Sequence, residues 1–217
     1  MSEAMTVEVW SDIACPFCYI GKRKFEAGVA DSGVAVAVEY RSFILTPDAP
    51  ADLPGGNFAR LAEKFGVSEA EARAMEQRIA ETARGVGLEF DYARMQPANT
   101  LLAHQLLHYA HALGRQAEMK ERLLRAHFTE GRHVGRIGDL AELATEIGLD
   151  RADVVRSLKA GEHLDAMQAD IAQAQSHGIR GVPFYVIDGK YAVSGAQDPA
   201  VFAQALTQAH DERTTNP

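Results

Sequence analysis

Cysteine is scarce in this chain, since its 217 residues contain only two, Cys15 and Cys18. Two cysteines are too few for the disulfide framework of a secreted scaffold, and in a reducing compartment such a pair more often performs redox chemistry or binds metal. A structural zinc site usually needs four cysteine or histidine ligands with paired spacing, and no second Cys-x-x-Cys is present. The scarcity therefore favours redox chemistry at one place in the chain, and we expect no metal there.

Long apolar runs and an excess of positive charge are also missing. No segment approaches the roughly 18 apolar residues of a membrane span, and residues 1–5 have neither the basic nor the apolar region of a signal peptide. The net charge of −8, with lysine and arginine scattered, argues against nucleic acid or an anionic membrane surface as the main partner. We therefore expect a cytoplasmic protein that binds neither nucleic acid nor membrane.

The two cysteines stand between a strand pattern and a helix pattern. Residues 6–10 alternate as a short strand does, and the segment after Cys18 predicts a helix that reaches about Asp31. Pro16 suits the first turn of that helix, because the N–H that proline lacks would have no partner there. Strand, Cys-x-x-Cys and helix in this order are typical of a thioredoxin-like fold.

Cys15 is then expected at the start of the helix. Unpaired backbone N–H groups and the positive end of the helix dipole favour a thiolate there, which lowers the pKa and makes Cys15 the expected nucleophile. Cys18 lies one turn further along and should be less exposed. From that position its thiol can resolve a mixed disulfide formed on Cys15. The motif thus predicts catalysis by both cysteines.

The middle of the chain has mostly helical patterns. Residues 34–43 alternate as a strand, and the prolines and glycines of residues 46–56 exclude a helix or a central strand. After them the composition is rich in helix-forming residues. Helix starts are expected at the capping box of residues 68–71 and at Asp139. Whole helices are expected at residues 98–113, 115–129, 151–160 and 162–177.

Strand patterns return near the C-terminal end, and a last helix follows them. Asp188-Gly189, between two β-prone runs, is the strongest short-range sign of a two-residue hairpin. A disordered tail is expected after the last helix. The expected elements are strands at residues 182–187 and 190–194, a helix from residue 198 to about 209, and a tail at residues 211–217.

These elements predict one interrupted domain. The opening strands are too few for a stable sheet, and the later hairpin alone would be marginal as well. Because each needs the other, we expect an α/β protein of thioredoxin-like fold, βαβ then ββα, with a large all-helical domain inserted. Residues 1–46 and 178–217 would form the thioredoxin-like domain, and residues 47–177 the helical domain.

Several motifs together resemble one known family. They are Cys15-Pro16-Phe17-Cys18-Tyr19-Ile20-Gly21, Gly181-Val182-Pro183-Phe184 and Val193-Ser194-Gly195-Ala196-Gln197. This set resembles the FrnE-like branch of the DsbA family of thiol–disulfide oxidoreductases. Residues 97–100, Ala103-His104 and residues 126–131 are similar to the helical-domain motifs of that branch, so the resemblance covers nearly the whole chain.

The resemblance implies properties that composition does not show. The Val182–Pro183 peptide would be cis, would face the dithiol and would shape the substrate groove, with the backbone of Val182 pairing with an extended substrate. No organic cofactor is implied beyond the redox-active disulfide Cys15–Cys18. Many relatives carry histidine or tryptophan where this chain has Phe17, which cannot donate a hydrogen bond to a thiolate. We therefore expect a less oxidising couple than that of a periplasmic oxidant.

Other polar positions have two interpretations each. Asp12, three residues before Cys15, would be a proton acceptor for the dithiol or, as we favour, an Asx turn or a helix cap. His104 would approach the dithiol from the helical domain or be a satisfied interior residue. His104, His108 and His111 fall at i, i+4 and i+7, and this stripe would bind metal or, as we favour, form a polar face.

The leading interpretation is an enzyme, a DsbA-like thiol–disulfide oxidoreductase that acts on protein or small-molecule thiols and disulfides as a monomer or homodimer. One alternative is a glutathione-dependent transferase or isomerase of the kappa or 2-hydroxychromene-2-carboxylate isomerase type. Those relatives typically have serine at the position of Cys15, and glutathione is also a candidate co-substrate of the leading activity. A further alternative is a non-catalytic binding or chaperone-like module.

Overall fold

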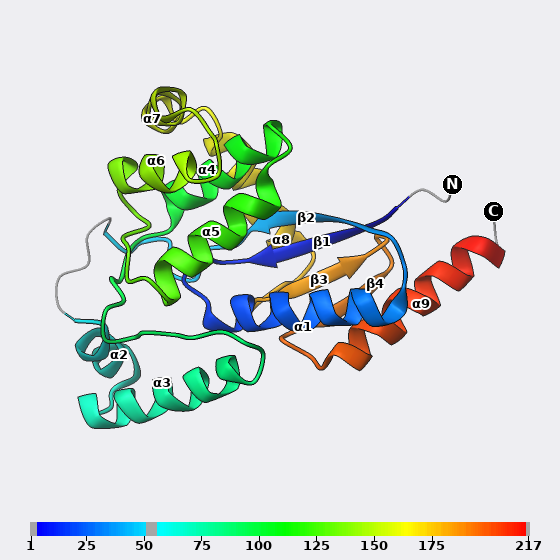
Figure 1. Cartoon of the computed structure of the whole chain (residues 1–217), viewed down its shortest axis with the longest axis horizontal. Helices are drawn as coiled ribbons and strands as arrows, with labels where there is room; N and C mark the ends of the chain where they lie inside the picture. Colours follow the sequence, from blue (N-terminus) through cyan, green and yellow to red (C-terminus); the bar gives the residue numbers. More distant parts are fainter. Residues whose placement is uncertain (1–3, 51–55, 216–217) are drawn as a thin grey trace.

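A mixed sheet forms the centre of the protein (Figure 1). The computed structural model describes residues 4–50 and 56–215. In this part of the chain, four strands follow the order β2-β1-β3-β4. β1 (Met5–Ser11) lies parallel to β2 (Val36–Ser42), and α1 (Pro16–Ser32) connects them. The expected βαβ unit is therefore confirmed.

The second half of the sheet comes from the far end of the sequence. β3 (Phe184–Ile187) runs antiparallel both to β1 and to β4 (Tyr191–Ser194), and α9 (Pro199–Thr215) follows. Both residues of the Asp188-Gly189 pair have positive φ, 54° and 65°, as the hairpin requires. Ile187 pairs with Tyr191, so three residues separate the strands where we expected two.

Two helices, α1 and α9, cover one face of the sheet (Figure 1). Val7 and Val9 of β1 point into this layer because side chains alternate along a strand. They meet Phe25 of α1 and Phe202 of α9, and all of these side chains are buried. The two helices approach closely at Gly28, where a Cβ atom would lie 2.7 Å from the Cβ of Phe202. Any larger residue at this position would push α9 away.

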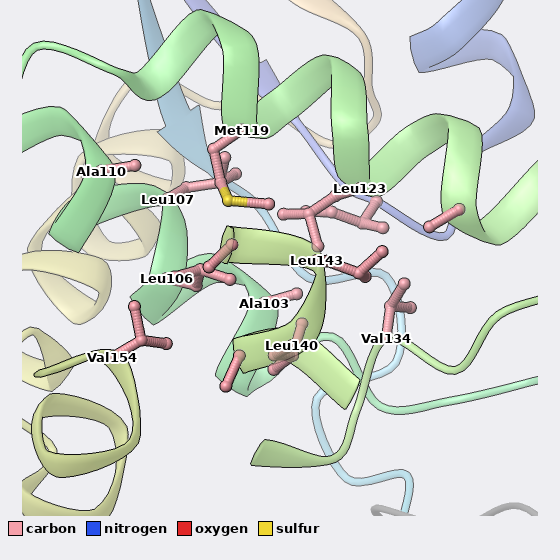
Figure 2. Packing of buried hydrophobic residues seen from close by; sticks show 14 of the residues in the cluster. Ala103, Leu106, Leu107, Ala110, Met119, Leu123, Val134, Leu140, Leu143 and Val154 are labelled. Carbon is pink, nitrogen blue, oxygen red and sulfur yellow. The ribbon is translucent and has the colours of Figure 1, made fainter. Parts of the chain in front are cut away.

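The helical segment lies between β2 and β3 in the sequence. Its helices are α2 (Asn57–Phe65), α3 (Glu69–Arg84), α4 (Leu101–Ala112), α5 (Gln116–Phe128), α6 (Ile137–Thr145), α7 (Arg151–Ala160) and α8 (Leu164–Ser176). The core of this segment is built mainly from leucines and alanines of α4, α5, α6 and α7, together with Met119 and a few residues from the adjoining loops. Figure 2 shows Leu106, Leu123, Leu140 and Val154 converging in it. The α/β fold with a helical insertion is as expected.

The two parts of the molecule share buried contacts. Ile13, in the loop between β1 and α1, is fully buried in the core of the helical segment. On the other sheet face, Trp10 of β1 packs with Ala174 of α8 and with Ile179. The loop that carries the dithiol is therefore held from both sides. The division into residues 1–46 with 178–217 and residues 47–177 stays a prediction.

One of the two expected helix starts is wrong. Asp139 does not start a helix, because α6 begins at Ile137 with Arg136 as its N-cap, and Asp139 lies inside the first turn. A carboxylate is favourable there too, since it faces the positive end of the helix dipole. By contrast, the capping box is confirmed, with the Ser68 side chain accepting from the Glu71 backbone N–H and the Glu71 side chain accepting from the Ser68 backbone N–H.

The expected disordered tail is also wrong over the residues that the structure describes. α9 continues to Thr215, whereas we expected it to end near residue 209. Glu212 explains the extension, because it forms an ion pair with Lys190 and accepts a hydrogen bond from Tyr191. Arg213 lies 3.6 Å from the carboxylate of Asp188. The hairpin thus holds the last turns of the helix, and residues 216–217 lie outside the described part.

Candidate active site

Cys15 lies directly before the first residue of α1. It is the N-cap residue, with Pro16 following, and no side chain caps the helix there. The Cys18 backbone N–H donates to the Cys15 carbonyl at 3.0 Å, so the two cysteines occupy one tight turn. Both are free thiols, and they are almost equally buried, at 4% and 3% exposed. Cys18 is thus the less exposed of the two, as expected, but only by this small margin.

The two thiols have opposite electrostatic environments. The hydrogen bond from Cys18 lowers the pKa of Cys15 and outweighs the effect of burial, and backbone N–H groups of the first turn help. Burial raises the pKa of Cys18, and the adjacent Cys15 sulfur raises it further. Of the two thiols, Cys15 is therefore the one that ionises first, with Cys18 donating a hydrogen bond to its sulfur.

The Val182–Pro183 segment covers Cys15 from the other side. Its peptide bond is cis, and the Val182 carbonyl accepts a hydrogen bond from the Cys15 thiol at 3.5 Å. The expected position opposite the dithiol is therefore confirmed, and it explains why Cys15 is covered. Gly21 permits the close approach, because a Cβ atom there would lie 2.9 Å from Cγ of Pro183 and 2.7 Å from the Tyr185 hydroxyl.

Asp12 is fully buried at the end of β1 and gathers hydrogen bonds from three segments. One carboxylate oxygen accepts from the Thr100 hydroxyl at 2.7 Å and from His104 Nε2 at 3.2 Å. The other accepts from the Leu45 N–H at 2.8 Å. Burial alone would raise the pKa of Asp12, but these hydrogen bonds and the His104 ring outweigh it and lower the pKa to about 2.

The cap interpretation of Asp12 is wrong, because no side chain caps α1. The Asx turn is present, with the Ala14 N–H donating to Asp12 at 3.3 Å. Burial lowers the pKa of His104, so its neutral ring donates from Nε2 to Asp12. His104 Nδ1 has no hydrogen-bond partner among the described residues, as suits an unprotonated nitrogen. His104 is thus an interior residue that reaches the dithiol loop through Asp12.

His104, His108 and His111 each lie near a different carboxylate. His108 Nε2 lies 3.1 Å from Asp170 of α8, and His111 lies 3.9 Å from Glu39 of β2. Each ring therefore ties α4 to a different segment. Over residues 4–50 and 56–215, no group of three or more histidine, cysteine, aspartate or glutamate side chains is arranged to hold a metal ion.

Lys120 is a buried residue near the dithiol that the sequence interpretation missed. Its side chain on α5 is 1% exposed, lies over the Tyr40 ring and has no hydrogen-bond partner within the described residues. Burial lowers the pKa of Lys120, while negative charge on Cys18 and Asp12 opposes this. One feature of the sequence could have indicated its burial: Lys120 lies between Met119 and the buried leucines that follow on α5.

His127 is a second buried residue with no assigned role in the sequence interpretation. It lies on α5, is 2% exposed, and has no hydrogen-bond partner for Nδ1 among the described residues. Burial lowers the pKa of His127 to about 4, with His133 contributing. The folded protein therefore keeps this ring neutral at pH values where an exposed histidine is charged.

We expect His127 to make the protein less stable in acid. The unfolded chain binds a proton here near pH 6.5, whereas the folded chain does so only near pH 4. The stabilisation present above pH 6.5 is thus lost as the pH falls to 4, by about 3 kcal/mol. Urea unfolding of wild type and His127→Gln across this range measures it. The variant should show the shallower pH slope, and parallel curves for wild type and His127→Gln would contradict the expectation.

Phe17 lies outside this buried cluster. Phe17 directly precedes Cys18 in the chain, and its ring is 44% exposed. Leu45, whose backbone N–H binds Asp12, is 42% exposed. Exposed apolar side chains beside a reactive thiol suit contact with a substrate.

None of the described helices is long and apolar enough to cross a bilayer.

Comparison with known proteins shows to which family the chain belongs. A family model described as a DSBA-like thioredoxin domain matches residues 6–207. The uncharacterized protein YwbO of Bacillus subtilis (strain 168) is 29% identical over 203 residues, which cover 93% of this chain and 95% of YwbO. A crystal structure of a probable DsbA oxidoreductase from Streptomyces coelicolor is 39% identical, with a TM-score of 0.88, over 96% of this chain and 91% of the other.

A more distant structure shares the fold. The cytosolic disulfide reductase DsbM from Pseudomonas aeruginosa is 22% identical, with a TM-score of 0.65, over 95% of this chain and 98% of its own. DsbM has also been solved with GSH. The same arrangement of sheet and helical insertion therefore recurs at low sequence identity.

Proposed function

Because the chain belongs to the DSBA-like thioredoxin domain family, we propose that Cys15 is the attacking thiol and Cys18 the resolving thiol of a thiol–disulfide oxidoreductase. The Cys15 thiolate attacks one sulfur of a substrate disulfide, which forms a mixed disulfide and releases the first substrate thiolate. Cys18 loses its proton and attacks the Cys15 sulfur, which closes the Cys15–Cys18 bond and releases the second substrate thiolate. Two electrons pass from the dithiol to the substrate, and the reverse sequence oxidises a substrate dithiol.

The observation that carries this assignment is the placement of both thiols within one turn, with Cys15 as the N-cap of α1 and against the Val182 carbonyl. Cys15, at the start of α1, has the lowered pKa, and Cys18 the raised one. The thiolate is the nucleophile in disulfide exchange, so attack begins at Cys15. The raised pKa of Cys18 keeps it protonated until Cys15 has reacted.

Val182 and Pro183 support the substrate site. The Val182 carbonyl already accepts from the Cys15 thiol, so an extended substrate lying along this segment would bring its disulfide to Cys15. The exposed ring of Phe17 gives the same site an apolar edge. We propose protein or small-molecule disulfides and thiols as substrates.

Three buried residues support the dithiol without contacting substrate. Asp12 and His104 hold the loop before Cys15 through their shared hydrogen bonds. Lys120 fits a role in the resolving step, because negative charge on Cys18 raises the pKa of its amine. Transfer of the Cys18 proton to Lys120 would then accompany the attack of Cys18.

No organic cofactor or metal takes part in this proposal. The Cys15–Cys18 pair itself carries the electrons, and glutathione is a candidate co-substrate, since a protein of the same fold has been solved with GSH. We further propose a cytoplasmic setting, on the named location of DsbM. We propose thiols and disulfides as the partners of the protein, and neither nucleic acid nor membrane.

Reduction of a protein disulfide tests the proposal against a glutathione-dependent transferase or isomerase. Retention of Cys15 favours disulfide exchange, because those enzymes activate the thiol of glutathione and typically have serine at this position. We expect the purified dithiol form to reduce insulin disulfides, with the Cys15–Cys18 bond formed in equal amount. Glutathione conjugation or isomerisation without any disulfide reduction would overturn the assignment.

Phe17 leads to a prediction about the reduction potential. Phe17 offers the Cys15 thiolate neither a hydrogen bond nor a charge, whereas a histidine there would stabilise the thiolate of the reduced form. We expect Phe17→His to raise the potential by about 30 mV or more, equivalent to about 1.4 kcal/mol. Equilibration with glutathione buffers measures the shift, with Phe17→Leu as the apolar control. A histidine variant with the wild-type potential would contradict the argument.

A further inference from the structure

One buried hydroxyl near the dithiol has no role in the reaction as described above. Tyr185 lies on β3, two residues after Pro183, and is only 1% exposed. Its hydroxyl oxygen is buried and has no hydrogen-bond partner among the described residues. Burying such a group is costly, because it gives up its hydrogen bonds with water. In native structures, a group of this kind often has a functional cause.

The Tyr185 hydroxyl lies against the helix that carries the dithiol. Its ring packs on Phe25 of α1 and Phe202 of α9, with centroid separations of 5.2 and 4.7 Å. The hydroxyl end of the ring reaches Gly21, where a Cβ atom would lie 2.7 Å from the oxygen. Gly21 follows Cys18 by three residues in α1, and this spacing places both on the same face of the helix. The hydroxyl is therefore held on the face of α1 to which Cys18 belongs.

The charge of the dithiol acts on this hydroxyl. Burial raises the pKa of Tyr185 well above its ordinary value, and negative charge on Cys18 raises it further, with Cys15 contributing. The hydroxyl therefore keeps its proton when a thiolate forms on α1. It can offer Cys18 an O–H group, and it cannot take the proton of the thiol.

The Cys18 sulfur changes as an acceptor during the reaction. In the resting dithiol Cys18 is a thiol, whose sulfur is a weak acceptor, so it offers the Tyr185 hydroxyl little. In the resolving step Cys18 must become a thiolate, and its burial opposes that charge. A hydrogen bond to an ionised acceptor is about twice as strong as one between neutral groups. The hydroxyl is therefore needed most at the moment when Cys18 ionises.

We propose that the Tyr185 hydroxyl donates a hydrogen bond to the Cys18 sulfur as it ionises, and so accelerates the resolving step. The proposal rests on the function proposed above, since Cys18 must be the resolving thiol. Tyr185 acts from β3 and stabilises the transient thiolate, whereas Lys120 acts from α5 and takes the proton. The two residues therefore have separate tasks at the same sulfur.

The resolving step is balanced in atoms and electrons. Cys18 gives its proton to the neutral Lys120 amine, and the Cys18 thiolate attacks the Cys15 sulfur of the mixed disulfide. The Cys15–Cys18 bond forms, the bond between Cys15 and the substrate sulfur breaks, and the substrate leaves as a thiolate with the electron pair. Tyr185 keeps its proton and is neither oxidised nor reduced. In the reverse reaction Cys18 leaves as the same thiolate, so the hydroxyl acts in both directions.

The reaction with 5,5′-dithiobis(2-nitrobenzoate) separates the two attacks. Attack by Cys15 releases one thionitrobenzoate, and attack by Cys18 releases the second at a rate independent of reagent concentration. Stopped-flow absorbance follows both releases. We expect Tyr185→Phe to slow the second release about tenfold and to leave the first within about twofold. Tyr191→Phe makes the same change on β4, where the hydroxyl donates to Glu212, and should leave both within about twofold.

Two further readouts distinguish this role from a structural one. Tyr185→Phe removes a buried hydroxyl without a partner, so urea unfolding should show equal or higher stability. Neither the resting dithiol nor the disulfide contains a Cys18 thiolate. The equilibrium constant with glutathione should therefore stay within about twofold, while the resolving step and its reverse slow by the same factor.

The possible outcomes separate this proposal from the proposed function. An unchanged second release in Tyr185→Phe overturns the role of the hydroxyl, and so does a loss of stability with equal slowing of both releases. In either case, loss of the second release in Cys18→Ser would still support Cys18 as the resolving thiol. A second release that is as fast in Cys18→Ser as in wild type would overturn both proposals.

Discussion

Replacing Cys15 with serine is expected to lower the rate of protein-disulfide reduction by about a thousandfold or more. A serine hydroxyl is not ionised at neutral pH and is a poor nucleophile towards a disulfide. Cys18 cannot take over, because its burial, which the variant keeps, raises its pKa and holds it protonated. The chain has no third cysteine. Insulin reduction by wild type and variant, at equal protein concentration, measures the loss.

Cys18→Ser is the matched control, because it leaves the attacking thiol in place. The first attack should proceed, and the mixed disulfide on Cys15 should accumulate because no thiol resolves it. Mass spectrometry after acid quenching identifies the modified cysteine. Accumulation of a mixed disulfide on Cys18 in the Cys15→Ser protein would reverse the order of attack and contradict the mechanism.

Asp12→Ala is expected to lower the free energy of unfolding by about 3–5 kcal/mol. The change leaves buried donors without their acceptor, namely the Thr100 hydroxyl, the His104 ring and the Leu45 N–H. Each such group costs about 1–3 kcal/mol when it loses its partner. Urea unfolding at pH 7 measures the loss, and the same variant should react more slowly at Cys15, because the loop before it is no longer held.

The pH dependence of the free energy of unfolding separates the contribution of the Asp12 charge from that of its hydrogen-bond acceptors. Its pKa is lowered to about 2 in the folded protein, so its stabilisation is present above the ordinary value of 3.8 and is lost as the pH falls towards 2. The shift corresponds to about 2 kcal/mol. Asp12→Asn keeps one acceptor and should cost less than Asp12→Ala at pH 7. Equal losses at pH 7 and pH 2.5 for Asp12→Ala would contradict a role for the carboxylate charge.

The position of the dithiol could be predicted because its determinants are local. Pro16 and the flanking patterns place Cys15 at a helix start, and the structure has it there. The opposite side, Val182–Pro183, came from resemblance alone, since nothing in the spacing of residues 182–183 specifies a cis bond or a contact with Cys15. Local sequence therefore predicted the reactive group and not the surface that faces it.

The buried polar contacts could not be predicted because their partners are distant in the sequence. Asp12 meets a backbone N–H of residue 45 and side chains from α4. The stripe that begins at His104 suggested a metal or a polar face, whereas its partners are carboxylates in the loop after β1, on β2 and on α8, which helix spacing does not reveal. The apolar pattern of α5 could indicate that Lys120 is buried, but it could not indicate that Lys120 lies near the dithiol. Such contacts depend on how the helical insertion packs on the sheet.

The ionisation of the two thiols tests the central claim most directly. Thiolate absorbance near 240 nm, followed from pH 3 to 10, reports the pKa of each cysteine in the reduced protein. We predict one transition below the ordinary range of a thiol, present in wild type and in Cys18→Ser and absent from Cys15→Ser. A low transition that survives in Cys15→Ser and disappears in Cys18→Ser would contradict the assignment of Cys15 as the attacking thiolate.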